Sequence, residues 1–215
     1  FEHPWNLGNK ITNSFLVASG TVLLAIPMAT MAAYAFSRFD FRFKKTIFLF
    51  VIASQFIPAA VIVLPYFLMF KQLNMLDTRS ALVLINMSIV LPYAVWMMKG
   101  FIDAVPLEIE ESAMVDGAHR IRVIWEIMVP AALPGIITAA VFSFTLTWNE
   151  FLFALIIGKQ DALTLPIGLI GFRTERGDLW ELMAAGGILI TAPMFLISLL
   201  VQKQFIKSLT TGAVR

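Results

Sequence analysis

Cysteine is absent from this sequence of 215 residues, and charged side chains are scarce, since Asp, Glu, Lys and Arg together make up 14% of it. Without cysteine the chain can form neither a disulfide nor a thiolate metal site. Soluble domains carry about 25% charged residues, so the chain has too little charge to cover a water-facing surface. Its formal net charge of +2 is also too small to indicate a nucleic-acid partner, which would be bound through a basic surface.

The sequence also lacks the groups from which enzyme sites are built. Its two histidines, His3 and His119, are far apart along the chain, and no nucleophile–base arrangement can be recognised. The pair Gly158-Lys159 is followed by Gln160, where a phosphate-binding loop would have a Ser or Thr to hold Mg²⁺. We therefore predict a non-catalytic chain without metal or cofactor, so that any ATP and Mg²⁺ would be bound by a separate subunit.

What the sequence has in excess is apolar side chains, at 59% of residues and a mean hydropathy of +0.83. A chain of this size cannot hide so much apolar surface in one soluble core, and lipid is the natural solvent for the remainder. About 20 apolar residues in a helix cross the hydrocarbon core. We expect one all-α domain over 1–215, a polytopic transmembrane helical bundle with five spans at about 11–36, 46–70, 80–101, 130–157 and 183–206.

Each expected span contains proline, which is tolerated in membrane helices because neighbouring helices and polar side chains satisfy the freed carbonyl. Prolines are common in membrane helices in general, but they also fit the kinked helices of a transporter. The prolines are Pro27, Pro58, Pro65, Pro92, Pro134 and Pro193.

The basic residues predict the orientation, because loops rich in Lys and Arg stay in the cytoplasm. Ten of the 16 basic residues fall in the loop set 37–45, 99–129 and 202–215, which includes Arg42 and Lys44, and six fall in the opposite set, which includes Lys159. We therefore expect the first set inside and a multi-pass location in the cell (inner) membrane.

The long loop 102–129 has the pattern of two amphipathic helices around a turn. Pro106 suits a first helical turn, and Gly117 suits the residue after a helix end. Arg122 and Glu126, four apart, can pair on one face. A hairpin resting on lipid headgroups is the plain alternative, but such helices are rich in Lys and Arg. This segment has six acids from Asp103 to Glu126, which favours a basic protein partner.

Within this loop the residues Glu111-Ser-Ala-Met-Val-Asp-Gly-Ala118 and Ile127-Met-Val-Pro130 resemble the EAA signature of binding-protein-dependent ABC importer permeases. Ser112 and Val129 depart slightly from that signature. In the family this loop is the coupling element that docks on the cytoplasmic ATPase. The resemblance therefore implies an ATPase-coupling role for Glu111, Ala113, Asp116, Gly117, Ala118, Ile127 and Pro130.

The similarity extends along most of the chain and points to the maltose-type, carbohydrate branch. It includes Asn13-Ser-Phe15, 33–39, Trp148-Asn-Glu-Phe151, 165–169, Met183-Ala-Ala-Gly186 and the tail 204–214. It implies transport of a sugar by alternating access. The implied partners are cytoplasmic ABC ATPase subunits, a second permease subunit in a heterodimer, and an extracytoplasmic sugar-binding protein. Because the family has six helices, we expect one more before Phe1.

Asn149 and Glu150 are candidates for the substrate pathway. An acid inside a membrane span is costly and often functional, but the span 130–157 is longer than the hydrocarbon core, and Trp148 beside Glu150 also suits an interface belt. Other readings stay open: an ABC permease for a non-sugar solute, or an ion-coupled secondary transporter, for which Glu150 is the only intramembrane acid. A membrane enzyme is a remote further alternative. Which sugar is carried, and which residues contact it, cannot be read from the sequence.

Overall fold

The computed structural model describes the backbone of residues 6–174 and 177–212 and the side chains of residues 6–172 and 179–199. The tail motif at 204–214 lies outside the described side chains. The described residues are helical almost throughout, which confirms the all-α prediction. The described residues include one pair of strands, a short antiparallel hairpin of β1 (Arg173–Thr174) and β2 (Gly177–Asp178), and turns and loops join the helices.

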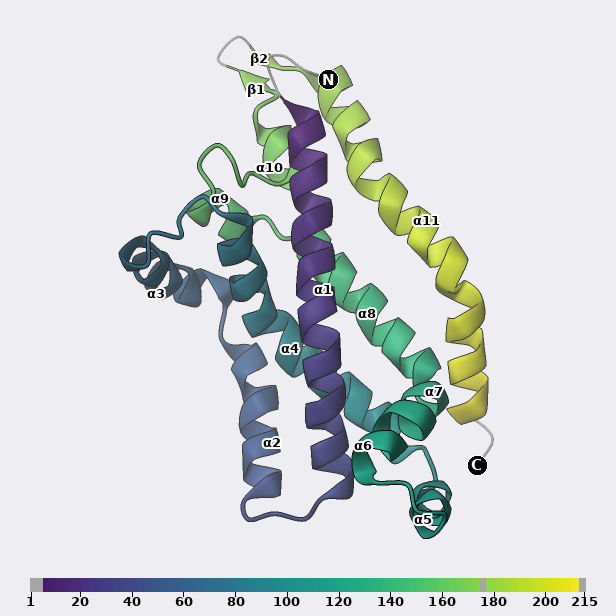
Figure 1. Cartoon of the computed structure of the whole chain (residues 1–215). Helices are drawn as coiled ribbons and strands as arrows, with labels where there is room; N and C mark the ends of the chain where they lie inside the picture. The colour runs from purple at the N-terminus through teal and green to yellow at the C-terminus, as the bar shows by residue number, and fades with distance from the viewer. Residues whose placement is uncertain (1–5, 175–176, 213–215) are drawn as a thin grey trace.

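Helix α1 (Leu7–Arg38) runs the length of the molecule and packs on α4 (Arg79–Asp103), and α8 (Leu133–Trp148) lies beside both (Figure 1). Four alanines of α1, at positions 18, 25, 29 and 33, are fully buried. Small side chains let membrane helices approach closely. Gly135 of α8 serves the same purpose, because a Cβ at this position would collide with the ring of Phe101 on α4.

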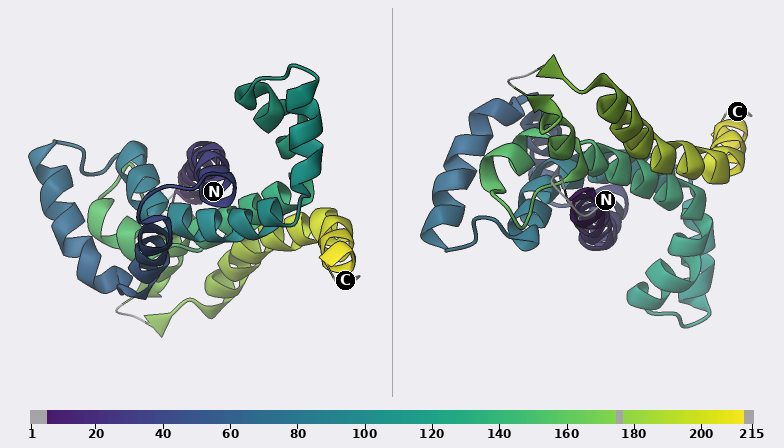
Figure 2. Two further views of the ribbon diagram at one scale, coloured as in Figure 1. Left: turned by 90° about the horizontal axis from the view of Figure 1, so that it is seen from below. Right: turned by 90° about the horizontal axis from the view of Figure 1, so that it is seen from above.

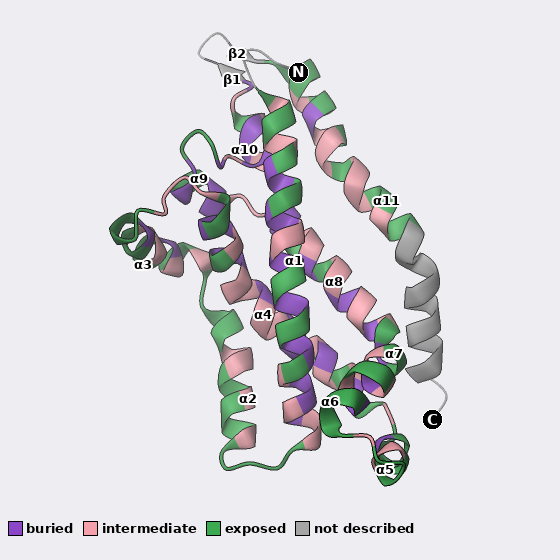
Figure 3. Ribbon diagram, in the orientation of Figure 1, coloured by how far each residue is buried: buried purple, intermediate pink, exposed green. Residues whose placement is uncertain are grey.

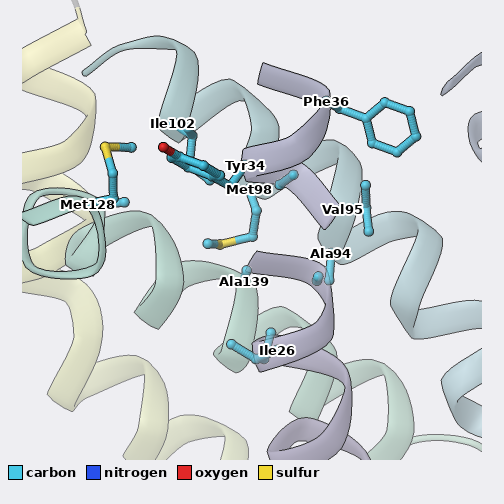
Figure 4. Packing of buried hydrophobic residues seen from close by; sticks show 12 residues of the cluster. Ile26, Tyr34, Phe36, Ala94, Val95, Met98, Ile102, Met128 and Ala139 are labelled. Carbon is cyan, nitrogen blue, oxygen red and sulfur yellow. The ribbon is translucent and has the colours of Figure 1, made fainter. Parts of the chain in front are cut away.

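The main core cluster joins α1, α4 and α8 with the end of the 102–129 loop. Figure 4 shows Ile26 of α1, Met98 and Ile102 of α4 and Ala139 of α8 gathered around the same interior. Met128, from the second helix of the loop, is 2% exposed and belongs to this cluster. The loop is therefore attached to the bundle by apolar packing at its base.

The second expected span, 46–70, is not one straight helix. It consists of α2 (Lys44–Ala53), a 3-10 turn η1 (Ser54–Phe56) and α3 (Ala59–Gln72), and the two arms meet at 96°. The break falls at Pro58, which has no N–H to donate, and Ile57 before it is extended with ψ 117°. A residue before proline is pushed out of the helical region, which explains the position of the bend.

The fourth expected span, 130–157, is also interrupted and needs correction. Helix α8 ends at Trp148, and the short helix α9 (Leu152–Ile157) follows after a break. On its other side α8 bends by 77° from the segment Arg120–Ala131, next to Pro134, which lacks an N–H. That segment comprises α6 (Arg120–Val123), the π-helical turn η2 (Ile124–Met128) and α7 (Val129–Ala131).

The remaining helices are α5 (Leu107–Val115), α10 (Leu165–Ile170) and α11 (Trp180–Gly212). Among the described residues, three helices are long and apolar enough to cross a membrane, and the number rises to five when each bent pair counts as one span. Figure 2 shows α5 and α6 projecting from the bundle on the side away from α11. Much of α2 and α3 is exposed, whereas α1 and α4 carry most of the buried positions (Figure 3).

Candidate functional site

The turn at Gly117 closes helix α5 and redirects the chain. Gly117 has φ +89°, a left-handed conformation, and follows the end of α5 as the sequence predicted. Its N–H donates to the carbonyl of Met114 at 3.1 Å, and the N–H of Ala118 donates to the carbonyl of Ala113 at 3.0 Å. These two bonds define a Schellman motif, in which a left-handed residue satisfies the last helical carbonyls. Glycine is favoured here because a Cβ is disfavoured at positive φ.

The second helix of the loop begins after His119 and continues to Ala131. Arg122 Nε and Glu126 Oε2 lie 2.7 Å apart on its surface, as the spacing predicted. The opposite face is buried through Val123 and Met128. The π-helical turn ends at Met128, two residues before Pro130, whose missing N–H interrupts the regular hydrogen-bond ladder of the helix.

A buried ion pair fixes α5 to the end of α1. Arg38 Nε and Glu110 Oε1 are 2.5 Å apart, with side chains 10% and 2% exposed. Tyr34 donates its hydroxyl to Glu110 Oε2 at 2.9 Å. Arg38 Nη2 donates to the carbonyls of Ile102 at 3.0 Å and Val105 at 2.6 Å. One arginine therefore connects α1, the end of α4 and α5.

Two further contacts strengthen the same corner. Asp103 accepts bonds from Ser37 Oγ and Lys99 Nζ, both at 2.5 Å. The guanidinium of Arg120 lies 4.8 Å from the centre of the Phe39 ring, a distance suited to a cation–π contact. Helices α5 and α6 are thus attached to the bundle by polar as well as apolar contacts.

The arm formed by α5, the Gly117 turn and α6 presents acids and apolar groups to its surroundings. Glu111 and Asp116 are exposed, and Val115 is 87% and Ile121 65% exposed. Glu110 differs from its neighbours, because it pairs internally with Arg38. Of the six acids counted in this segment, Glu110 pairs with Arg38, Asp103 with Lys99 and Glu126 with Arg122.

The sequence-predicted coupling residues lie on this arm and at its base. Glu111, Ala113, Asp116, Gly117 and Ala118 belong to α5 and its turn, and helix α5 contacts both α6 and η2. Ile127 and Pro130 lie further along the second helix, where the arm joins the bundle.

The predicted pathway residues lie apart from the arm, at the other end of α8. Asn149 is exposed and its amide donates to the carbonyl of Thr145 at 2.8 Å. The Glu150 carboxylate accepts the N–H groups of Phe153 at 2.7 Å and Ala154 at 3.2 Å. Glu150 thus caps α9 in the way that acidic side chains satisfy free N–H groups at a helix start.

Trp148 does not lie in an interface belt, and that expectation is wrong. It is 2% exposed and its indole N–H donates to the carbonyl of Ile190 in α11 at 3.1 Å. Its ring also stacks on Phe144 at 5.7 Å. An apolar environment with one hydrogen-bond partner suits a buried tryptophan.

Sequence reasoning missed a second polar attachment, at the opposite end of the molecule. The Asp77 carboxylate accepts the backbone N–H groups of residues 159, 160, 161 and 162 at 2.8 to 3.1 Å. Burial alone would raise the pKa of Asp77, but these four donors stabilise the carboxylate and lower it below its ordinary value of 3.8. No sequence pattern predicts the contact between Asp77 and residues 159–162, or the pairing of Arg38 with Glu110.

The structure offers little for metal binding: no group of three or more His, Cys, Asp or Glu side chains that could hold a metal ion occurs within the described part of the chain. The arm combines exposed acidic and apolar side chains with a firm attachment to the bundle. Such an arrangement suits a surface that contacts another protein.

Comparison with known proteins places this arrangement in a family. Residues 25–211 match the family described as the binding-protein-dependent transport system inner membrane component. The chain is 35% identical over 205 residues to a probable ABC transporter permease, y4oR, of Sinorhizobium fredii, covering 95% of this chain and 74% of the relative.

Several relatives have names that state what they carry, and two of them cover the whole of this chain. The diacetylchitobiose uptake permease DasC of Streptomyces coelicolor is 30% identical over all of this chain and 77% of its own length. The melibiose/raffinose/stachyose import permease MelC of Bacillus subtilis is 30% identical over all of this chain and 80% of its own.

Solved structures show the same fold at low sequence identity. A bacterial ABC transporter that imports the acidic polysaccharide alginate matches with TM-score 0.77 and 20% identity, covering 94% of this chain and 76% of the other. The MetNI methionine transporter in an inward-facing conformation matches with TM-score 0.72 and 14% identity, covering 92% and 91%.

Proposed function

The chain belongs to the family of binding-protein-dependent transport system inner membrane components, and from this premise we propose that it carries a sugar across the cell membrane as one permease subunit of an ATP-driven importer. Relatives named for diacetylchitobiose and for melibiose, raffinose and stachyose support the sugar class. The observation that carries the coupling part of the proposal is the arm 107–123, which is exposed at its tip and fixed to α1 by the Arg38–Glu110 pair.

We assign the arm to docking on a cytoplasmic ATPase subunit, which binds and hydrolyses ATP with Mg²⁺. The exposed acids Glu111 and Asp116 favour basic residues opposite, and Val115 offers an apolar contact. Ala113, Gly117 and Ala118 shape the turn, and Ile127 and Pro130 join the arm to the bundle. This chain itself contributes no catalytic group and no cofactor.

The attachment of the arm suggests how ATP-driven movement would reach the transport pathway. Arg38 holds α5 to the end of α1, and α1 packs along α4 and α8. A shift of the arm therefore moves α1 with it, because packed cores pass displacement on as rigid elements. Alternating access would follow if the second permease subunit moves in the opposite sense.

Three further partners belong to the proposal. They are the second permease subunit in a heterodimer, the lipid bilayer, and an extracytoplasmic protein that delivers the sugar. Delivery would occur at the end of the molecule that carries Asp77 and the 159–162 loop, opposite the arm (Figure 1). Asn149 and Glu150 remain candidates for the pathway near that end.

Purification tests the proposal directly. Wild-type protein extracted in mild detergent should bring an ATPase and a second permease subunit with it, and cells should take up a sugar bound by the matching binding protein. Glu111→Lys should reduce ATPase co-purification at normal abundance, because it places like charges face to face. Glu181→Lys, an exposed charge reversal at the start of α11, is the matched control.

Two results would contradict the proposal. Wild-type uptake and ATPase recruitment in Glu111→Lys would remove the arm from the coupling role. Co-purification of an ATPase with a binding protein that takes a non-sugar solute would keep the importer and reject the sugar class.

A further inference from the structure

The break in the second span lies near the middle of the membrane. Helix α2 has ten residues from Lys44, which corresponds to about 15 Å at 1.5 Å per residue. That distance is about half of a hydrocarbon core about 30 Å thick. The interruption at Ser54–Pro58 therefore falls at a depth where water is excluded by lipid.

Irregular backbone cannot face lipid at this depth. Ile57 and Pro58 are extended, with ψ 117° and 136°, and residues 54–58 are exposed on the surface of this chain. Non-helical backbone is tolerated within a membrane only where protein covers it or where it lines a water-filled cavity. The bend therefore faces the interior of the assembled transporter.

A pocket of about 380 Å³ opens at this bend, between η1, α3 and α4. Its size falls in the range of small-molecule sites, about 300–1,000 Å³. Polar groups line it through Ser54, Gln55, Tyr66 and Ser88, beside apolar walls from Pro58 and Ile89. None of the described residues that line it is charged.

The polar groups of the pocket are held in fixed positions. Gln55 Nε2 donates to the carbonyl of Ile89 at 3.1 Å, which ties the bend to α4. Ser54 and Ser88 donate their hydroxyls to backbone carbonyls at 2.7 and 2.6 Å. Each hydroxyl oxygen can therefore still accept a hydrogen bond from a ligand. The carbonyl oxygen of Gln55 and its second N–H are likewise available to a ligand.

The uncharged polar lining of the pocket favours a neutral ligand with many hydroxyl groups. A pocket without charge offers nothing to an ion, whereas amides and hydroxyls both donate to and accept from sugar hydroxyls. The Tyr66 ring, stacked on Phe70 at 6.0 Å, supplies a flat apolar face for the C–H groups of a sugar ring. The second pocket, at the outer end of α1, includes Lys10, Arg79 and Asp161 and is less suited to a neutral solute.

We propose that the pocket at the bend, formed by Ser54, Gln55, Tyr66 and Ser88, is the subsite through which this subunit binds the sugar in transit. The inference rests on the proposed function and adds to it a location and a set of contacts. The sugar leaves its binding protein, meets the bend at mid-membrane, and exchanges its water for these side chains.

Uptake by two variants tests the subsite. Gln55→Ala and Tyr66→Leu should each lower the sugar uptake rate roughly tenfold, since loss of one ligand hydrogen bond or stacking face is worth about one such factor. ATPase and second-subunit co-purification should stay at wild-type levels, as should stimulation of ATP hydrolysis by the loaded binding protein. Gln72→Ala, at the exposed end of α3, should leave uptake unchanged.

A labelling measurement keeps the test independent of any folding defect. Because the chain has no cysteine, Ser88→Cys places one thiol in the pocket. It should react with a small hydrophilic maleimide, and sugar together with its binding protein should slow that reaction. Asp40→Cys, exposed in the loop between α1 and α2, should react at the same rate with and without sugar.

Three outcomes would overturn the subsite. The first is wild-type uptake in both Gln55→Ala and Tyr66→Leu. The second is loss of the second permease subunit from these variants, because the bend would then be a subunit contact. The third is labelling of Ser88→Cys at a rate that sugar does not slow. Absence of sugar uptake by the wild-type transporter would instead reject the proposed function.

Discussion

At the scale of single residues, the contrast between two glycines isolates the role of the turn. A Cβ at Gly117 or at Gly100 would meet no atom within 4 Å. Steric collision is therefore excluded at both positions, and only the backbone differs. Gly117 is left-handed at φ +89°, whereas Gly100 lies inside α4.

We expect opposite effects from the same substitution at these positions. Gly117→Val should cost at least about 1–2 kcal/mol of local stability, because a side chain strains left-handed backbone. It should also weaken ATPase recruitment, or uncouple ATP hydrolysis from sugar, at normal membrane abundance. Gly100→Val should be neutral or slightly stabilising, since glycine is a poor helix former. Sugar uptake, ATPase rate and ATPase co-purification should be measured for both variants. Equal results for Gly117→Val and Gly100→Val would refute a coupling role for the turn.

The Arg38–Glu110 pair is the second feature with residue-level consequences. Both side chains are nearly inaccessible to solvent, so removing one leaves the other charge uncompensated. Arg38→Met alone and Glu110→Leu alone should each destabilise the protein by about 3–5 kcal/mol. The double variant should regain much of that loss, because two apolar groups replace the pair without leaving a buried charge.

Thermal unfolding in detergent of the four proteins forms a double-mutant cycle. A large favourable coupling energy is the expected result. Additive losses would mean that the two side chains act independently, and the attachment of the arm would then have to rest on Met128 and its apolar neighbours.

At the scale of elements, six prolines that look alike in the sequence behave differently. Pro27, Pro65, Pro92 and Pro193 lie inside helices that continue past them. Pro58 and Pro134 accompany bends of 96° and 77°. The existence of the helices could be predicted from apolar runs, but the bends could not, because neighbouring helices decide whether a freed carbonyl finds a partner.

The carboxylate of Asp77 links two loops, and this link should depend on pH. Its pKa is lower in the folded protein than the ordinary 3.8. The stability that it contributes is therefore fully present well above pH 3.8, and is lost as pH falls through the lowered pKa. Wild-type protein should lose stability on acidification in that range, and Asp77→Asn should lack this part of the pH dependence.

Hydrogen exchange can report the link locally. Amides 159–162 should exchange faster in Asp77→Asn near neutral pH, because a neutral amide offers one acceptor oxygen where the carboxylate offers two. Asp161→Asn, an exposed neighbour in the same loop, should keep wild-type protection. Unchanged exchange in Asp77→Asn would show that the loop is held by other contacts.

At the scale of the whole molecule, the loops that the charge pattern assigns to the cytoplasm lie together at one end. The start of α2, the arm and the end of α11 lie at one end, and the 159–162 loop lies at the other (Figure 1). We predict that Lys44 faces the cytoplasm and Lys159 faces outside. In intact cells an impermeant thiol reagent should label Lys159→Cys but not Lys44→Cys, and the reverse pattern would invert the topology.

The features that could be predicted from the sequence are local, and those that could not are contacts between residues far apart in the chain. The glycine turn and the Arg122–Glu126 pair follow from neighbours three or four residues apart. Arg38 and Glu110 are 72 residues apart, and Asp77 is more than 80 from its donors. No periodicity encodes such partners, so Arg38 could be counted only as a basic loop residue and Glu110 only as an acid near a helix start.

The buried Asn13 side chain has a consequence for the order in which the protein is made. Its amide donates to the carbonyls of Asp161 and Leu163, which follow 148 and 150 residues later. At about 5–20 residues per second, the ribosome needs about 7 to 30 s to reach them. During that interval the first helix holds a polar amide without its final partners at its outer end. The insertion machinery, or water at the membrane surface, must accommodate it until residue 163 has been made.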